Sequence, residues 1–504
     1  MKKKKLTKKM LGPVITIIIL TIVVTLLSAA FSLIEIDAEK TVIIRGTLET
    51  SIITVNNILT KDGISYILKN VLTNLQIFEP LFLLIISLTA IGIGEASGLF
   101  KAIFQPFKRI NNKFLTLIIL LIGIISSFIG DYSYVFLMPL TAILYQYMGK
   151  KPLLGILTIF LGITIGYGTG IIYNNEGIVL STLTTNAASL DVDKGFSFVL
   201  KSNIYIMFVS TAILAFVGTH IIHSLLDKKI PKSEIIDDDL IVSKKGLYYS
   251  NLTFLFIILG LIYMITPGIK GSGFLLGSGE SYIERLMGEN SPFANGLPFI
   301  VLTILMICSY VYGYISGNIK NSTEYSLGLS KNFKSLGYVF VLLFFTAQLV
   351  GIFEWTNLGK VIGYKLVTLT TVVPFSGIIL LLFVFAIFIL MSLFIPSSIE
   401  KWEMASPLII PLMMKSNITP NFTQFLFRAA DGIGKCLTPL FPYYIITLAF
   451  LEKYNTKDNN KITVFGTLKL LFPTILMFAL LWLIIIVGWF ILGLPIGPET
   501  YATY

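Results

Sequence analysis

Residues 392–402 read SLFIPSSIEKW and interrupt an otherwise strongly apolar stretch of the chain. A second polar segment, RAADGIGKCLTPLFPY, occupies residues 428–443 in similar surroundings. Bare backbone and charged side chains are costly at membrane depth, where only contact with protein or a water-filled cavity makes them tolerable. The two segments therefore predict a hairpin tip and an unwound helix inside a membrane protein.

The composition of the whole chain agrees with this prediction. Its 504 residues are 55% hydrophobic and 13% charged, whereas soluble domains carry roughly 25% charged residues. The net charge of +11 comes from Lys and Arg in short loops, which indicates orientation in the lipid bilayer and not nucleic-acid binding. Cys308 and Cys436 lie in apolar segments, so we expect them to be small packing residues and not a disulfide or a metal site. His220 and His223 could bind a metal ion together, but they lack a nearby third ligand.

Apolar runs longer than about 18 residues recur along the chain and predict an all-α polytopic membrane protein. Basic clusters at 101–113, 228–245, 320–334 and 453–461 are assigned to the cytoplasm. The interrupted apolar pairs 114–148 and 374–415 then enter and leave on one side as re-entrant hairpins. The predicted spans, nine in number, are 11–35, 80–100, 153–175, 204–225, 249–268, 298–316, 335–352, 421–452 and 468–494. We expect a multi-pass protein of the plasma membrane with a cytoplasmic N-terminus and an extracellular C-terminus.

An internal repeat relates the two halves. A shift of 268 residues places Pro139-Leu140 on Pro407-Leu408 and Gly166 on Gly434. An odd linker span makes the second half inverted, and inverted repeats with broken helices are typical of secondary transporters. The predicted organisation begins with a basic segment and first span at 1–35 and an extracellular loop at 36–79, which contains a short amphipathic helix near 64–75. A first repeat follows at 80–225 with broken helix 153–175, and then a linker region at 226–297 with span 249–268. A second repeat at 298–494 with broken helix 421–452 and a tail at 495–504 complete the chain.

The second half carries the denser candidate chemistry. Half-helix N-termini at the hairpin tip suit an anionic group, and freed carbonyls with Asp431 suit a small cation. Arg428 and Asp431 are three residues apart, so a purely structural buried salt bridge is the alternative. Glu400, Lys401 and Glu403 are alternatively placed in water at the tip. Trp402 is either a cavity wall or an aromatic of the membrane interface.

The first half offers a weaker counterpart. Asp131 lies at the tip of the first predicted hairpin, and a glycine-rich stretch at 162–170 is expected to unwind the following helix. Glycines there also serve close helix packing, which is the alternative explanation. The candidate residues of this half are Asp131, Thr169, Asn174, Asn175 and Glu176.

These segments resemble the aminobenzoyl-glutamate transporter family. The match runs from Ser392 to Tyr444, with further matches at 92–99, 139–153 and 347–359. The resemblance implies a homodimer that moves folate-related aromatic carboxylates, some relatives exporting sulfonamide-like antimetabolites, with Na⁺ or H⁺ as the coupling ion and no other cofactor. The substrate residues implied by position are Trp402, Pro407, Arg428, Pro439 and Pro442, to which the polar hairpin tip adds the hydroxyls of Ser397 and Ser398. The coupling residues implied are Ser392, Asp431 and Thr438, with Na⁺ placed at Ser392 and Asp431.

The chain departs from this family pattern at two positions. Ser392 stands where an asparagine is expected to help bind the cation, and Gly177 stands where an aspartate is expected, with Glu176 beside it. A carrier for other organic anions or amino acids, of the dicarboxylate or basic-amino-acid exchanger type, is the alternative within the same class. A channel does not fit the inverted repeat. A membrane-embedded enzyme is disfavoured because no nucleophile with a base and no metal motif accompanies the polar segments.

Overall fold

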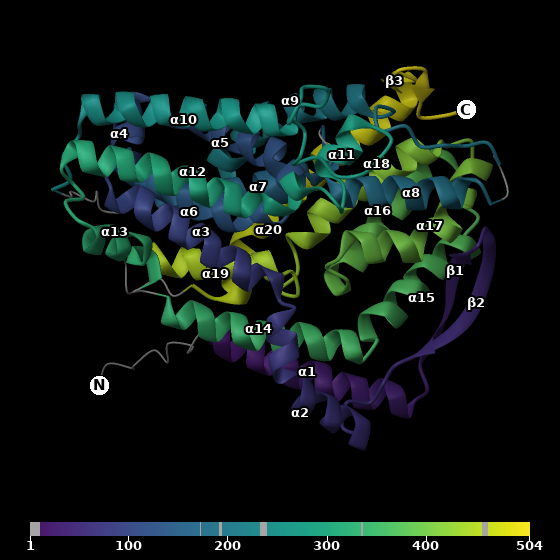
Figure 1. The fold of residues 1–504 in the computed structure, drawn as a ribbon. Helices are drawn as coiled ribbons and strands as arrows, with labels where there is room; N and C mark the ends of the chain where they lie inside the picture. Colours follow the sequence, from purple (N-terminus) through teal and green to yellow (C-terminus); the bar gives the residue numbers. More distant parts are fainter. Residues whose placement is uncertain (1–10, 172, 191–193, 232–238, 334–335, 456–461) are drawn as a thin grey trace.

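The computed structural model describes residues 11–171, 173–190, 194–231, 239–333, 336–455 and 462–504. The basic start of the chain lies outside these residues. The described chain is mainly helical (Figure 1), with only two short two-stranded sheets. The predicted all-α polytopic fold is confirmed.

In the described residues, nine helical segments are long and apolar enough to cross a membrane. Two of them lie inside the predicted hairpins, and the predicted spans 153–175 and 421–452 are instead each divided into shorter helices. The nine are α1 Pro13–Leu33, α2 with α3 at Lys61–Ala96, α5 with η2 at Asn112–Ile129, α9 with η4 at Ile204–Lys229, α10 Lys244–Ile265, α12 Pro292–Ser316, α14 Gly337–Trp355, α16 Gly377–Phe394 and α20 Val464–Leu492.

The first interrupted pair consists of α5 (Asn112–Ser126), the turn η2 (Ser127–Ile129) and α6 (Tyr132–Tyr147). Gly130 closes the turn with a φ of +58°, a conformation that favours glycine. The next helix is broken into α7 (Pro152–Ile165), η3 (Gly166–Gly168) and α8 (Asn175–Ala188). The break therefore falls in the predicted glycine-rich stretch.

The second pair repeats this order of elements. Helix α16 ends at Phe394, Ser397 caps α17 (Ser398–Lys415), and the following helix is broken into α18 (Pro420–Lys435) and α19 (Pro442–Lys453). Proline at the first position of α18 and α19 is compatible with helix initiation because the first turn needs no amide donor. The re-entrant course of both pairs and the inverted relation of the halves stay predictions.

The two halves meet through their broken helices. Helix α17 packs on α8, and α18 packs on η3 and α7. A Cβ added at Gly432 would lie 2.3 Å from the carbonyl oxygen of Thr164, so only glycine allows this approach of α18 to α7. The second polar segment is thereby held against the glycine-rich stretch of the first half, and the first polar segment lies against α8.

The remaining elements surround these broken helices (Figure 1). Helix α2 (Lys61–Gln76) contains the predicted amphipathic helix, whereas the hairpin of β1 (Asp37–Ile44) and β2 (Thr47–Thr54) was not predicted. Helices α1 and α2 both pack on α14. The other elements are α3 Glu79–Ala96, α4 Leu99–Phe104, η1 Gln105–Arg109, α9 Ile204–Leu225, η4 Asp227–Lys229, α11 Tyr282–Met287, α13 Ser322–Leu329, η5 Lys331–Phe333, α15 Leu358–Val372, β3 Pro495–Gly497 and β4 Thr500–Tyr501.

Candidate functional site

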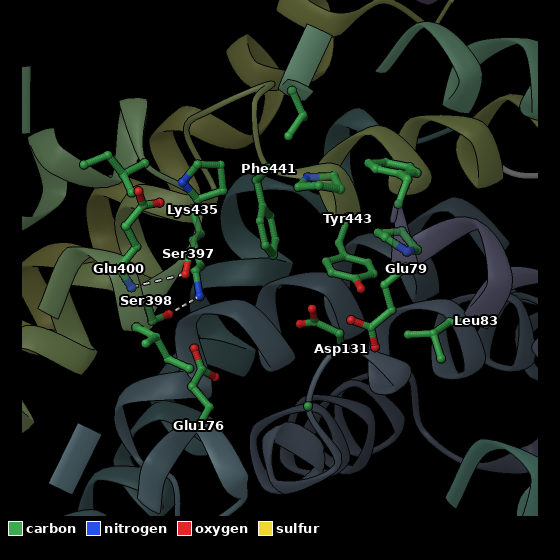
Figure 2. A pocket seen from close by; sticks show the side chains of 18 of the residues that line it. Glu79, Leu83, Asp131, Glu176, Ser397, Ser398, Glu400, Lys435, Phe441 and Tyr443 are labelled. Atoms are coloured by element: carbon green, nitrogen blue, oxygen red, sulfur yellow. Dashed lines mark hydrogen bonds between the residues drawn. The ribbon is translucent and has the colours of Figure 1, made fainter. Parts of the chain in front are cut away.

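A cavity of about 700 Å³ lies where both hairpin tips and both helix breaks meet (Figure 2). Residues 128–132 and 394–400 of the tips and residues 174–176 and 440–443 of the breaks line it. Residues of α3, α11, α12, α14, α15 and α18 complete its wall. The candidate residues that it brings together are Asp131, Asn174, Asn175, Glu176, Ser397, Ser398 and Pro442.

Two helices begin at the cavity with capped N-termini. The Ser397 side chain accepts a hydrogen bond from the Glu400 amide at 3.2 Å and caps α17. The Asn174 side chain accepts one from the Gly177 amide at 2.9 Å and caps α8. Helix N-termini carry partial positive charge and unpaired amides, so this wall of the cavity can receive an anionic group.

Charged side chains also line the cavity, and most are acidic. The carboxylate of Glu400 pairs with Lys360 at 3.3 Å, and both side chains are partly exposed. Figure 2 shows Glu79 and Asp131 beside the phenol of Tyr443. The acidic residues of the lining are Glu79, Asp131, Glu176, Glu354 and Glu400, and its basic residues are Lys360 and Lys435.

Next to the second tip, Asp431 forms an ion-pair cluster with two lysines, of which Lys401 is fully buried and Lys435 reaches the cavity lining. Its Oδ2 accepts a hydrogen bond from Ser398 at 2.7 Å and lies 3.2 Å from the Lys435 ammonium. Its Oδ1 accepts a hydrogen bond from Ser392 at 2.8 Å and pairs with Lys401. Lys401 is fully buried, so the alternative that placed it in water at the tip is wrong. It lies three residues after Ser398 on the same face of α17, which directs it toward Asp431.

Arg428 does not pair with Asp431, so the alternative of a salt bridge between them is wrong. Its guanidinium lies over the rings of Tyr167 and Tyr173, 4.9 and 5.4 Å from their centroids. The side chain is 3% exposed, and its Nε and Nη1 have no hydrogen-bond partner in the described part of the chain. A buried guanidinium with unused donors is an available partner for a carboxylate.

Trp402 lies outside the cavity lining, in the protein interior. Its ring stacks on Phe427 at 4.6 Å, and its indole nitrogen donates a hydrogen bond to Thr184 at 3.0 Å. It is fully buried, which excludes the alternative of an aromatic at the membrane interface. In this structure Trp402 joins α17 to α18 and α8.

The other candidate residues support the cavity without lining it. Thr438 donates a hydrogen bond to the Leu393 carbonyl at 2.7 Å, which ties the second helix break to the second tip. Thr169 donates to the Gly166 carbonyl at 2.7 Å inside the first break. Pro439 belongs to the second break, and Pro407 lies buried within α17.

Sequence reasoning missed part of the charge at this site. Lys435 is four residues after Asp431 on α18, a spacing that could have revealed the ion pair. Glu79 and Glu354 come from α3 and α14, far from either polar segment in sequence. No local pattern marks them, because only the packing of these helices brings them to the cavity.

Comparison with known proteins decides the family. The family model of the AbgT transporters matches residues 4–504. The chain belongs to the AbgT transporter family. This membership confirms the resemblance seen in the sequence. Because the family consists of transporters, it also points away from an enzyme.

Individual AbgT-type relatives match along nearly the whole chain. The p-aminobenzoyl-glutamate transport protein of Escherichia coli (strain K12) is 25% identical over 504 residues, covering 99% of this chain and 96% of that protein. The YdaH transporter of Alcanivorax borkumensis is 26% identical, covers 97% of this chain and 100% of its own, and superposes with a TM-score of 0.49. MtrF of Neisseria gonorrhoeae, described with a class of antimetabolite efflux pumps, is 24% identical with 98% of both chains covered and a TM-score of 0.48.

Proposed function

We propose that this AbgT-family protein is an ion-coupled secondary active transporter of the plasma membrane that carries p-aminobenzoyl-glutamate or a related aromatic carboxylate. The observation that carries the proposal is the cavity at which both tips and both helix breaks converge. In secondary transporters the substrate binds where discontinuous helices meet near the middle of the bilayer. The name of the Escherichia coli relative supports the substrate class.

The cavity matches such a substrate in size and surface. Its volume of about 700 Å³ falls within the usual range of roughly 300–1,000 Å³ for small-molecule sites. Tyr132, Phe441 and Tyr443 offer rings for an aromatic group, and the capped N-termini of α8 and α17 offer positive ends for a carboxylate. Arg428, with its unused donors, supplies a further carboxylate partner when the broken helices move.

The same proposal includes three finer statements. Transport is coupled to an ion gradient by alternating access, the N-terminus lies in the cytoplasm and the C-terminus outside, and two copies form a homodimer. Export of sulfonamide-like antimetabolites uses the same cavity, because these compounds share the aromatic amine of the proposed substrate. The lipid bilayer and the small aromatic carboxylate are then its partners.

Transport by purified full-length protein in liposomes tests the proposal. Labelled p-aminobenzoyl-glutamate should accumulate above equilibrium when a Na⁺ or H⁺ gradient is imposed, whereas a channel would only equilibrate it. Arg428→Met should raise KM about tenfold or more, since a charge-assisted hydrogen bond contributes about 1.5–3 kcal/mol. Lys331→Met, at a partly exposed pair with Glu95 away from the cavity lining, is the matched control. Absence of accumulation under both gradients would refute the proposal.

The charge of the lining favours a second candidate, a carrier of basic amino acids. Among the described residues of the lining, five carboxylates face the cavity and two lysines oppose them; Lys360 is paired with Glu400 and Lys435 with Asp431. A site with excess negative charge attracts a cationic group. Inhibition of labelled p-aminobenzoyl-glutamate uptake by arginine, without inhibition by free glutamate, would favour this candidate.

A further inference from the structure

The family resemblance places a Na⁺ ion at Ser392 and Asp431, and the oxygen atoms there would suit one. Asp431 offers two carboxylate oxygens, and the hydroxyls of Ser392 and Ser398 lie 2.8 and 2.7 Å from them. Carboxylate, hydroxyl and carbonyl oxygens are the usual ligands of hard cations in proteins. The oxygen set alone therefore fits a small cation.

The nitrogen atoms at the same place do not fit one. The Lys401 ammonium pairs with Asp431 Oδ1 and donates to the Ser392 hydroxyl at 3.0 Å. The Lys435 ammonium lies 3.2 Å from Oδ2 and donates to the Ser398 hydroxyl at 2.5 Å. Each carboxylate oxygen and each hydroxyl is thus already bound by an ammonium group of the chain.

The charge of the cluster disfavours a third cation as strongly as the geometry does. One carboxylate is opposed by two ammonium groups, so the cluster already carries net positive charge. Asp431 and Lys401 are both fully buried, where water screens repulsion least. Lys435 also experiences the charges of Glu176 and Asp131 from the first half of the chain. Figure 2 shows Glu176 directed toward Lys435 and Ser398.

We propose that Lys401 is a built-in cation of Asp431, which takes the place of a bound Na⁺, so that Na⁺ does not bind at Ser392 and Asp431. Ser392, which stands where an asparagine is expected, accepts a hydrogen bond from the Lys401 ammonium at 3.0 Å. Lys435 completes the set by holding the second carboxylate oxygen. The positive charge beside Asp431 thus comes from Lys401 of α17 and Lys435 of α18.

Na⁺ binding can be tested without any transported substrate, so this test does not depend on the proposed function. Thermal unfolding of the purified full-length protein in detergent is measured with NaCl and with choline chloride at equal ionic strength. The wild-type protein should show no Na⁺-specific rise in Tm. A Na⁺-specific rise that disappears in Ser392→Ala would overturn the proposal.

Removal of the Lys401 ammonium provides a second, complementary test of Na⁺ binding. Lys401→Met frees Asp431 Oδ1 and the Ser392 hydroxyl, so this variant should acquire a Na⁺-specific rise in Tm and bind ²²Na⁺, whereas Lys360→Met should not. If Lys401→Met folds and binds no ²²Na⁺, Lys401 is not what excludes the ion and the proposal fails. If the variant does not fold, ²²Na⁺ binding to the wild-type protein decides alone, and any binding that Ser392→Ala abolishes overturns it.

A consequence for transport rests on the proposed function. Gradient-driven accumulation of p-aminobenzoyl-glutamate should be unchanged when choline replaces Na⁺ on both sides of the liposome. Accumulation that requires Na⁺ would contradict the built-in cation. Absence of accumulation with either ion would instead refute the proposed function and leave the binding result to be judged separately.

Discussion

Asp431→Asn should destabilise the protein strongly, because it leaves two buried ammonium groups without a counter-charge. Asp431 is fully buried and pairs with both Lys401 and Lys435. Removing one partner of a buried ion pair costs about 3–5 kcal/mol. One serine hydroxyl can still donate to the amide oxygen of the new side chain, and the other can accept from its amide nitrogen, so the loss comes mainly from the unpaired charges.

The lysine variants should behave differently, which makes the cause testable. Lys401→Met leaves Asp431 paired with Lys435 as a neutral couple, so it should cost roughly 1.5–3 kcal/mol, the contribution of a charge-assisted hydrogen bond. In Asp431→Asn/Lys401→Met only one buried ammonium lacks a counter-charge. The double variant should therefore lose less than the sum of the single variants, by about 0.5–3 kcal/mol.

Equilibrium unfolding in mixed micelles measures these differences. The free energy of unfolding is determined for the wild type, both single variants and the double variant. Asp431→Asn combined with Lys360→Met is the control and should be additive, because Lys360 pairs with Glu400 instead. A loss below about 1 kcal/mol for Asp431→Asn, or strict additivity with Lys401→Met, would refute the reasoning.

Three further predictions follow from packing, hydrogen bonding and charge. Gly432→Ala should lower the unfolding free energy by about 1–3 kcal/mol, because the added methyl group clashes with the α7 backbone. Gly488→Ala in α20 is the control, since there is open space around its Cβ, and it should be neutral or stabilising by about 0.5–1 kcal/mol. Equal effects of the two substitutions would contradict the packing of α18 on α7. Trp402→Phe keeps the stacked ring and loses the indole hydrogen bond, so a calorimetric stability loss of about 1 kcal/mol is expected, and no loss would show that this bond is dispensable. Backbone amides, first that of Ser281, hold the pKa of Glu284 below its ordinary value. This carboxylate therefore stabilises the start of α11 at neutral pH and ceases to do so as the pH falls through that pKa. Amide hydrogen exchange at α11, corrected for its intrinsic pH dependence, should show loss of protection in acid, and Glu284→Gln should remove this pH dependence.

Much of the fold could be predicted from the sequence because membrane insertion imposes strong local rules. A spanning helix needs a long apolar run, and the runs at 11–35, 204–225 and 468–494 indeed coincide with α1, α9 and α20. Proline, glycine and serine likewise predicted the breaks, since they remove donors or cap helices. The hairpin of β1 and β2 escaped because its alternating residues resemble any amphipathic loop.

The candidate site was predicted less completely, since residue types do not reveal partners. The two tips and breaks were expected to line a cavity, and residues 128–132, 174–176, 394–400 and 440–443 do so. Trp402 was assigned to substrate or interface and lies instead against Phe427 and Thr184. Its position in sequence beside paired serines did not show which way its ring points.

The sequence by itself determined that this chain is a multi-pass helical membrane protein with two polar interruptions and a family identity, because hydropathy and short motifs are local properties. Only the tertiary structure decided which charges meet. Lys401 reaches Asp431 across 30 residues of chain because α17 folds back beside α18. Glu79, Glu176 and Glu354 reach one cavity from three separate helices. Electrostatic interactions depend on distance in space and on burial, and neither quantity can be obtained from the order of residues alone.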